Sequence, residues 1–140
     1  MILDGSALTT IMLDKPERSA FESAIVRSRR RVMSVVAYLE AMTAVQAVYG
    51  HEGALLLDEM AATLKIDIQP FSRAQMVEAK RAMEILTERQ RSVSFVIRLT
   101  PGECATFAQA AVTKDAALYD SDALRLTGLR RVALEEPMAA

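Results

Sequence analysis

Three acidic residues of this 140-residue chain each stand alone in a long apolar stretch. Asp4 is the only charged residue from position 1 to 13, Glu40 the only one from 32 to 50, and Glu103 the only one from 99 to 113. A lone carboxylate in a segment built for burial is costly unless it is protonated, paired or metal-bound. We therefore predict that folding brings the three carboxylates into one acidic site.

Such a site would favour a hard divalent cation. Carboxylate oxygens without histidine or cysteine select Mg²⁺ or Mn²⁺. A bound cation of this kind lowers the pKa of a coordinated water and can hold a phosphate oxygen. Asp120 and Asp122 follow a predicted strand and could join the site. The reaction that this chemistry suits is hydrolysis of a phosphodiester.

Each acidic residue also has a purely structural interpretation, and these alternatives stay open at the level of sequence. Asp4 could cap the turn after the first strand, and Glu103 fits a capping box with Thr100. Glu40 emerges from an apolar helix face, where a buried glutamate paired with an arginine would look the same. Asp120 and Asp122 are the least specific, since loops are rich in aspartate.

The elements that must position these residues alternate along the chain. Short apolar runs predict strands at 2–3, 32–35, 66–71 and 116–119, with a further candidate at 131–134. Helical spacing and capping signals predict helices from 5 to 13, from a start at 14–17 to about 28, from about 36 to 50, and over 52–64, 72–88 and 100–113. Residues 89–98 fit either a strand or an ordered loop. Alternating helices and strands predict an α/β fold whose parallel sheet is covered on both faces, with ligands bound at the carboxyl ends of the strands.

Composition is typical of one globular domain, which we place at 1–134, with 135–140 as a tail. Apolar residues make up 51% and charged residues 25%, and the net charge is −1. A polyanion would therefore have to meet local basic patches and a metal rather than a global field. The arginine cluster 29–31 reads as a solvated connection. The best basic candidates for contact with such a polyanion are Arg89, Arg91 and Arg98, which lead toward Glu103.

Two further features bear on the role of the single cysteine and on the cellular location of the protein. Cys104 is the only cysteine, and the only histidine, His51, lies in a different, polar turn, so we interpret Cys104 as a small buried residue rather than a nucleophile. We see no signal peptide, and the apolar run 32–49 is short and interrupted for a membrane span. We therefore expect a cytoplasmic protein without membrane association.

The chain resembles the PIN-domain ribonucleases, specifically the VapC-type toxins of toxin–antitoxin pairs. The resemblance lies in three segments and their spacing: Met-Ile-Leu-Asp4-Gly-Ser6-Ala-Leu, Ser-Val-Val-Ala-Tyr-Leu-Glu40-Ala and Leu-Thr-Pro-Gly-Glu103-Cys-Ala, followed by Asp122. It implies a PIN-like three-layer α/β/α fold with a short central parallel sheet. It also implies an acidic quartet of Asp4, Glu40, Glu103 and Asp122, in which Asp4 and Glu103 are the principal ligands of Mg²⁺ or Mn²⁺ and Ser6 orients Asp4.

The same resemblance implies three partners: a VapB-type antitoxin, an RNA substrate and a second copy of the chain in a homodimer. Of the apolar helix positions, which include Ile11, Met12, Leu55 and Met60, most are expected in the core and a minority in the groove where an antitoxin helix lies.

Departures from the family pattern predict a weakened nuclease. Gly5 stands where relatives carry a hydroxyl residue, which removes a donor and would loosen the turn. Glu103 is one methylene longer than the usual aspartate, and Asp120-Ser121 replaces Lys-Gly. The alternative is a catalytically degenerate PIN-fold binding module that keeps its antitoxin or dimer contacts.

Overall fold

Four short segments pair as parallel strands in the computed structural model, which describes residues 1–135. They are β1 (Ile2–Leu3), β2 (Val32–Ser34), β3 (Asp67–Gln69) and β4 (Ala117–Leu118), in the order β3-β2-β1-β4. Ile2 is in register with Val32 on one side and with Ala117 on the other. All four strands run the same way, so their carboxyl ends share one edge of the sheet.

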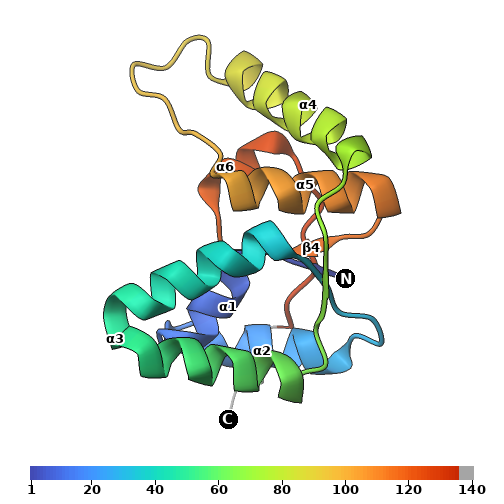
Figure 1. Cartoon of the computed structure of the whole chain (residues 1–140). Coiled ribbons are helices and arrows are strands. Elements are labelled where there is room, and N and C mark those ends of the chain that lie inside the picture. Colours follow the sequence, from blue (N-terminus) through green and yellow to red (C-terminus); the bar gives the residue numbers. More distant parts are fainter. Residues whose placement is uncertain (136–140) are drawn as a thin grey trace.

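Within residues 1–135, six helices cover the two faces of this sheet. They are α1 (Gly5–Met12), α2 (Arg18–Arg27), α3 (Val35–Thr63), α4 (Arg73–Arg89), α5 (Pro101–Thr113) and α6 (Asp122–Thr127). Figure 1 shows α4, α5 and α6 grouped in the upper part of the view and α1, α2 and α3 in the lower part. The predicted α/β fold with helices on both sides of a parallel sheet is confirmed.

Strands β1, β2 and β4 are buried because their side chains alternate between two cores, whereas the edge strand β3 is largely exposed. Leu3, Met33 and Leu118 pack with α1, α2 and α3, whereas their neighbours Ile2, Val32 and Ala117 pack with residues of α4, α5 and α6. This explains why β1 and β4, and Val32 and Met33 of β2, are continuous apolar runs rather than alternating ones. No helix among residues 1–135 is both long and apolar enough to cross a membrane.

The long helix α3 is two helical arms joined at Gly50, as the sequence predicted. Gly50 has φ +69°, a left-handed conformation that glycine adopts without strain. Gly53 lets the arms come together, because a Cβ there would lie 2.7 Å from the Cβ of Tyr49. The hydroxyl of Tyr38 on the first arm donates to Asp58 on the second. Burial raises the pKa of Tyr38, and this hydrogen bond raises it further.

Both predicted capping boxes, Ser72 with Gln75 and Thr100 with Glu103, are confirmed. The predicted helix start at 14–17 is wrong, since α2 begins at Arg18 and Glu17 makes no side-chain cap. Asp14 instead takes a left-handed conformation with φ +52° just after α1 ends.

The segment 131–134 is not a strand: an isolated bridge joins Arg131 to Ala117, and the side chain of Arg131 donates to the carbonyl of Tyr119. Residues 91–100 form a loop. The side-chain amide of buried Gln90 bonds both the N–H and the C=O of Ile97, which satisfies that backbone without a strand partner.

Two other local expectations need correction. Arg31 is not simply solvated, since its guanidinium donates to the carbonyls of Leu64, Val26 and Ser28 and joins the ends of α2 and α3. Helix α6 was not predicted at all. Of the predicted tail, Glu135 forms an ion pair with Arg27 at 3.3 Å, and residues 136–140 lie outside the described part of the chain.

Candidate functional site

Asp4 ends β1 and caps α1. Its Oδ2 accepts the Ser6 hydroxyl at 2.6 Å and the Ser6 backbone amide at 3.2 Å, as expected for a residue in extended conformation before a helix. Its other oxygen, Oδ1, accepts the hydroxyl of Thr106 from α5. The carboxylate is 2% exposed and is held entirely by neutral donors. The structural interpretation of Asp4 as a cap is therefore confirmed, and the cap lies at the carboxyl edge of the sheet.

Glu40 reaches from the first arm of α3 to the beginning of α5. The backbone N–H of Gly102 donates to its Oε2. A Cβ at position 102 would lie 2.6 Å from the carboxyl carbon of Glu40, so only glycine admits this approach. The partner of Glu40 is thus a backbone amide at a helix N-terminus, where a negative charge is favourable, and not an arginine.

Glu103 also has a structural role, in the capping box of α5. Its Oε1 accepts the Thr100 backbone amide at 2.8 Å, while the Thr100 hydroxyl accepts the Glu103 amide at 3.1 Å. The Ser121 hydroxyl donates to the other oxygen of Glu103 and also accepts the Leu124 amide at the start of α6. The side chain of glutamate is one methylene longer than that of aspartate, and this length lets Glu103 reach back to the Thr100 backbone amide in the capping box.

A pocket of about 220 Å³ brings these side chains together. Asp4, Ser6, Glu40 and Glu103 all line it, although they come from three separate parts of the chain. The remaining lining is small and mostly uncharged, and consists of Gly5, Thr9, Ala41, Ala44 and Thr100. The convergence predicted from the isolated charges is therefore present in the structure, while the catalytic and metal-binding roles of these residues stay predictions.

Asp122 does not line this pocket. Its side chain is 83% exposed and pairs with Arg125 at 2.8 Å. Asp120 pairs with the same arginine at 3.2 Å, and its backbone amide donates to the Ser6 hydroxyl that binds Asp4. Of the two, Asp120 has the closer connection to Asp4, through Ser6.

The electrostatics of the pocket favour a cation. None of the ion pairs found within residues 1–135 includes Asp4, Glu40 or Glu103, so their charges are offset only by amides and hydroxyls. Within the same residues, no three acidic, histidine or cysteine side chains already lie close enough to surround a metal ion. Mg²⁺ usually binds through one or two carboxylates and keeps several waters. The oxygen-only pocket fits a partly hydrated ion of this type rather than a closed protein cage.

Three neighbours of the acids were missed by sequence reasoning: Gly102, Thr106 and Ser121. The only readable signal was for Ser121, whose position before Asp-Ala-Leu is typical of a helix cap. The predicted weakening effect of Gly5 stays a prediction; in the structure Gly5 is the first residue of α1 and lies against α3. A Cβ there would lie 2.8 Å from the carbonyl oxygen of Ala37.

Cys104 is buried beside the site, and its thiol is free. Burial raises the pKa of Cys104, and the Glu103 and Glu40 carboxylates raise it further. The thiol is therefore kept protonated, which agrees with the prediction of a small buried residue.

The basic candidates differ in availability. Arg89 donates to the Leu126 carbonyl at 2.7 Å and closes the end of α6, and Arg91 pairs with Glu88 at 2.9 Å. Arg98 is exposed, and no ion pair involves it within the described residues.

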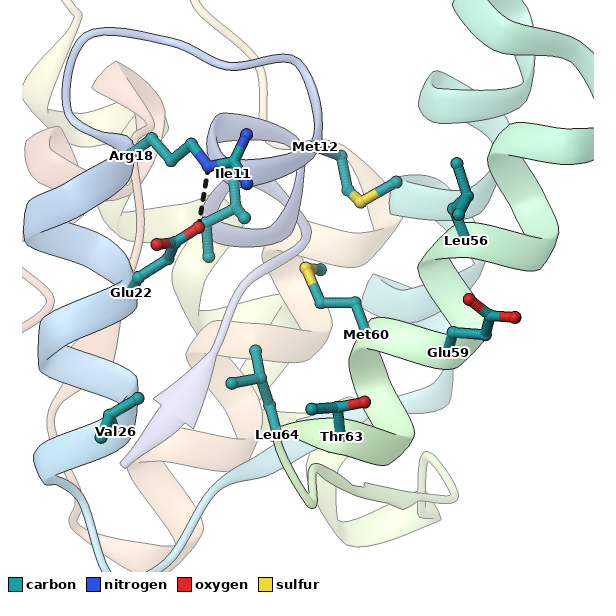
Figure 2. A pocket seen from close by; sticks show the side chains of 10 residues that line it. All are labelled: Ile11, Met12, Arg18, Glu22, Val26, Leu56, Glu59, Met60, Thr63 and Leu64. Carbon is teal, nitrogen blue, oxygen red and sulfur yellow. Dashed lines mark hydrogen bonds and ion pairs between the residues drawn. The ribbon is translucent and has the colours of Figure 1, made fainter.

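A second, larger cavity of about 470 Å³ lies between α1, α2 and the second arm of α3. In Figure 2, Met12 and Met60 point toward each other across this groove, and the ion pair between Arg18 and Glu22 lies at its rim. The groove is largely apolar and is lined by Ile11, Met12, Arg18, Glu22, Val26, Leu56, Glu59, Met60, Thr63 and Leu64. Three of the four apolar positions named from the sequence, Ile11, Met12 and Met60, thus line this groove, and Ile11 is also part of the buried core.

Comparison with known proteins gives a consistent result. No protein-family model matches the chain. It is 25% identical over 134 residues to the ribonuclease VapC30 of Mycobacterium tuberculosis, covering 96% of this chain and 99% of that one. It is 26% identical over 132 residues to a ribonuclease VapC of Mycolicibacterium smegmatis, covering 94% and 99%. The crystal structure of Mycobacterium tuberculosis VapC20, described as a toxin that cleaves the sarcin–ricin loop, superposes with a TM-score of 0.70 at 13% identity, covering 94% of this chain and 97% of that one.

Proposed function

Because the chain is a VapC-like protein in sequence and has the PIN-domain fold, we propose that it is a metal-dependent endoribonuclease, the toxin of a toxin–antitoxin pair. The observation that carries the proposal is the meeting of Asp4, Glu40 and Glu103 in one pocket without a basic partner. The proposal includes a cytoplasmic location, where RNA is available.

In this proposal Asp4 and Glu103 hold Mg²⁺ or Mn²⁺, and Glu40 completes the site directly or through water. The ion supplies an activated water and offsets charge on the scissile phosphate. Ser6 orients Asp4 by donating to its Oδ2. Asp122 is proposed as the fourth acid, reached through water, since its side chain lies outside the pocket lining. Of the three arginines predicted to contact RNA, Arg98 is the best placed to meet a phosphate, because it is exposed and has no ion pair within the described residues.

Cleavage of RNA by the purified chain tests this proposal. The chain, freed of antitoxin, should cleave a structured RNA such as a sarcin–ricin loop hairpin with Mg²⁺ or Mn²⁺, and EDTA should stop it. Asp4→Asn should abolish cleavage, because it removes the charge at the centre of the site. Asp14→Asn is the matched control, since Asp14 is exposed and pairs only with Arg18. Cleavage that survives both Asp4→Asn and EDTA would refute the mechanism.

A degenerate binding module is the second candidate, favoured by the engagement of Glu40 and Glu103 with backbone amides. Calorimetry separates the two, because a degenerate site should bind no Mn²⁺ at millimolar concentration. Glu103→Asp is the restoring variant to test, and a gain of cleavage would favour the degenerate native chain. Gly5→Thr is unsuitable for restoration, because its side chain would meet the Ala37 backbone.

We propose that the apolar groove binds the VapB-type antitoxin, as an amphipathic helix lying between α1, α2 and α3. Its floor and rim carry apolar side chains, and Val26 and Leu56 are more than half exposed. A groove of this kind suits helix-in-groove recognition. Met60→Lys should weaken antitoxin binding while RNA cleavage by the free chain is retained. Val112→Lys is the control, an equally drastic change on an exposed part of α5.

A homodimer is also part of the proposal. Exposed apolar side chains gather around a cavity of about 270 Å³ between α3, α4 and the start of α5, which Val36, Phe71, Met76 and Met83 help to line. Leu39, one turn after Val36, is 62% exposed, and Met76 is 52% exposed. Apolar surface of this kind is typical of an interface. Met76→Glu should convert the dimer to a monomer in sedimentation experiments, and a wild-type chain that is monomeric throughout would contradict this part.

A further inference from the structure

Thr106 is the least expected neighbour of the acidic pocket. It lies in the second turn of α5 and is fully buried. Its hydroxyl oxygen lies against Asp4 Oδ1, 102 residues away in sequence, and 3.0 Å from the Gly102 carbonyl oxygen of its own helix. A hydroxyl has one proton to give, and an ionised carboxylate competes for it better than a carbonyl. The Thr106 hydroxyl therefore donates its proton to Asp4 Oδ1.

The donors around Asp4 leave little of its carboxylate free. A carboxylate offers about four lone-pair sites, two on each oxygen. Both sites of Oδ2 are used by the amide and the hydroxyl of Ser6, and one site of Oδ1 is used by Thr106. One lone pair, on Oδ1, is left. Asp4 can thus ligate through a single oxygen and not through both.

Single-oxygen ligation discriminates between cations. Mg²⁺ takes a near-octahedral shell at short distances with few carboxylates, whereas Ca²⁺ takes more oxygens at longer distances and accepts two from one carboxylate. Ser6 holds Oδ2 and Thr106 holds Oδ1, so the two residues together fix the carboxylate of Asp4 against rotation. Removing the Thr106 hydroxyl would let the carboxylate turn away from Ser6 and offer both oxygens to a larger ion. The ordering of Asp4 by Thr106 would then be lost, together with the preference for the smaller ion.

We propose that Thr106 is a positioning residue: by holding Oδ1 it keeps the carboxylate of Asp4 in the orientation in which Ser6 occupies Oδ2, so that one oxygen is left to ligate and the pocket prefers Mg²⁺ or Mn²⁺ over Ca²⁺. This inference rests on the proposed function, because it assumes that the pocket binds a divalent ion. It deepens that function by assigning ion selectivity to a residue that is not itself a ligand.

Metal titration of the purified full chain tests the inference without reference to RNA cleavage. Mn²⁺ binding is followed by the loss of the free Mn²⁺ paramagnetic resonance signal, and Ca²⁺ affinity by its competition with Mn²⁺. Thr106→Val, which keeps the shape and removes the hydroxyl, should weaken Mn²⁺ binding by about 10- to 100-fold, the usual effect of losing a group that orients a metal ligand. It should also raise the affinity for Ca²⁺ relative to Mn²⁺. Thr106→Ser should bind as the wild type does.

Thr113→Val is the matched control, because Thr113 is on the same helix and its hydroxyl donates only to the Gln109 carbonyl. If Thr106→Val does not fold, the pair Thr106→Ser and Thr106→Ala carries the comparison, since these two differ only in the hydroxyl. Equal Mn²⁺ affinity and an equal ion preference with and without the hydroxyl would overturn the inference and leave the proposed function intact. A wild-type chain that binds no Mn²⁺ would overturn both.

Discussion

The contact between Gly102 and Glu40 leads to a quantitative prediction for Gly102→Ala. The added Cβ would lie 2.6 Å from the Glu40 carboxyl carbon, and ordinary carbon–carbon contact begins near 3.5 Å. The carboxylate must therefore move by roughly 0.9 Å. Because it is the end of a flexible side chain, it can move, but it then leaves the Gly102 amide. A hydrogen bond to a charged group contributes about 1.5–3 kcal/mol to stability.

The net effect is smaller, because alanine is favoured over glycine in a helix by about 1 kcal/mol. We expect Gly102→Ala to lower the free energy of unfolding by about 0.5–2 kcal/mol. In a Glu40→Ala background the clash and the hydrogen bond are both absent. There the same substitution should be neutral or should stabilise by up to about 1 kcal/mol.

Urea unfolding of the four proteins in EDTA measures this directly. The double-mutant cycle should give a coupling of about 1.5–3 kcal/mol between the two positions. Effects that add to within about 0.5 kcal/mol would refute the reasoning, since the two residues would then not share the contact described.

Three other predictions rest on single contacts. Gly5→Ala should lower the free energy of unfolding by about 1–3 kcal/mol in urea melts, because its Cβ would meet the rigid Ala37 carbonyl, and an unchanged stability would contradict that packing. Cys104 should resist iodoacetamide at neutral pH until the chain unfolds, because burial raises its pKa, and fast labelling of the native protein would argue against this. Stability should fall as the pH rises above about 10, because Tyr38 ionises in the unfolded chain while burial and Asp58 raise its pKa in the folded one, and Tyr38→Phe should reduce that slope in pH-dependent melts.

Much of the architecture was predictable because burial leaves a plain pattern in the sequence. Ile2 and Leu3 face opposite cores, so both must be apolar, and the strand reads as a continuous run. Charges that interrupt such runs are rare, which is why Asp4, Glu40 and Glu103 could be identified and their convergence anticipated. The break at Gly50 was likewise predictable from the conformational freedom of glycine.

The features that escaped prediction depend on contacts between distant residues. A threonine inside a helix gives no hint that its hydroxyl binds an aspartate, and only the packing of α5 against β1 puts Thr106 beside Asp4. Helix α6 has six residues, too few to show helical periodicity. Asp122 is exposed and pairs with Arg125. The spacing of three residues between them was visible in the sequence, but such a spacing brings side chains together only on a helix, and no helix was predicted there.

Helix α1 connects the acidic pocket with the apolar groove. Asp4 and Ser6 lie at its beginning beside the acidic pocket, while Ile11 and Met12 at its end line the apolar groove. Eight helical residues span about 12 Å, a distance that about four residues of extended chain can cover. A peptide bound in the apolar groove beside Met12 and Met60 therefore needs only a short extension to place a basic side chain in the acidic pocket. One continuous segment of a partner could thus both bind the groove and block the pocket.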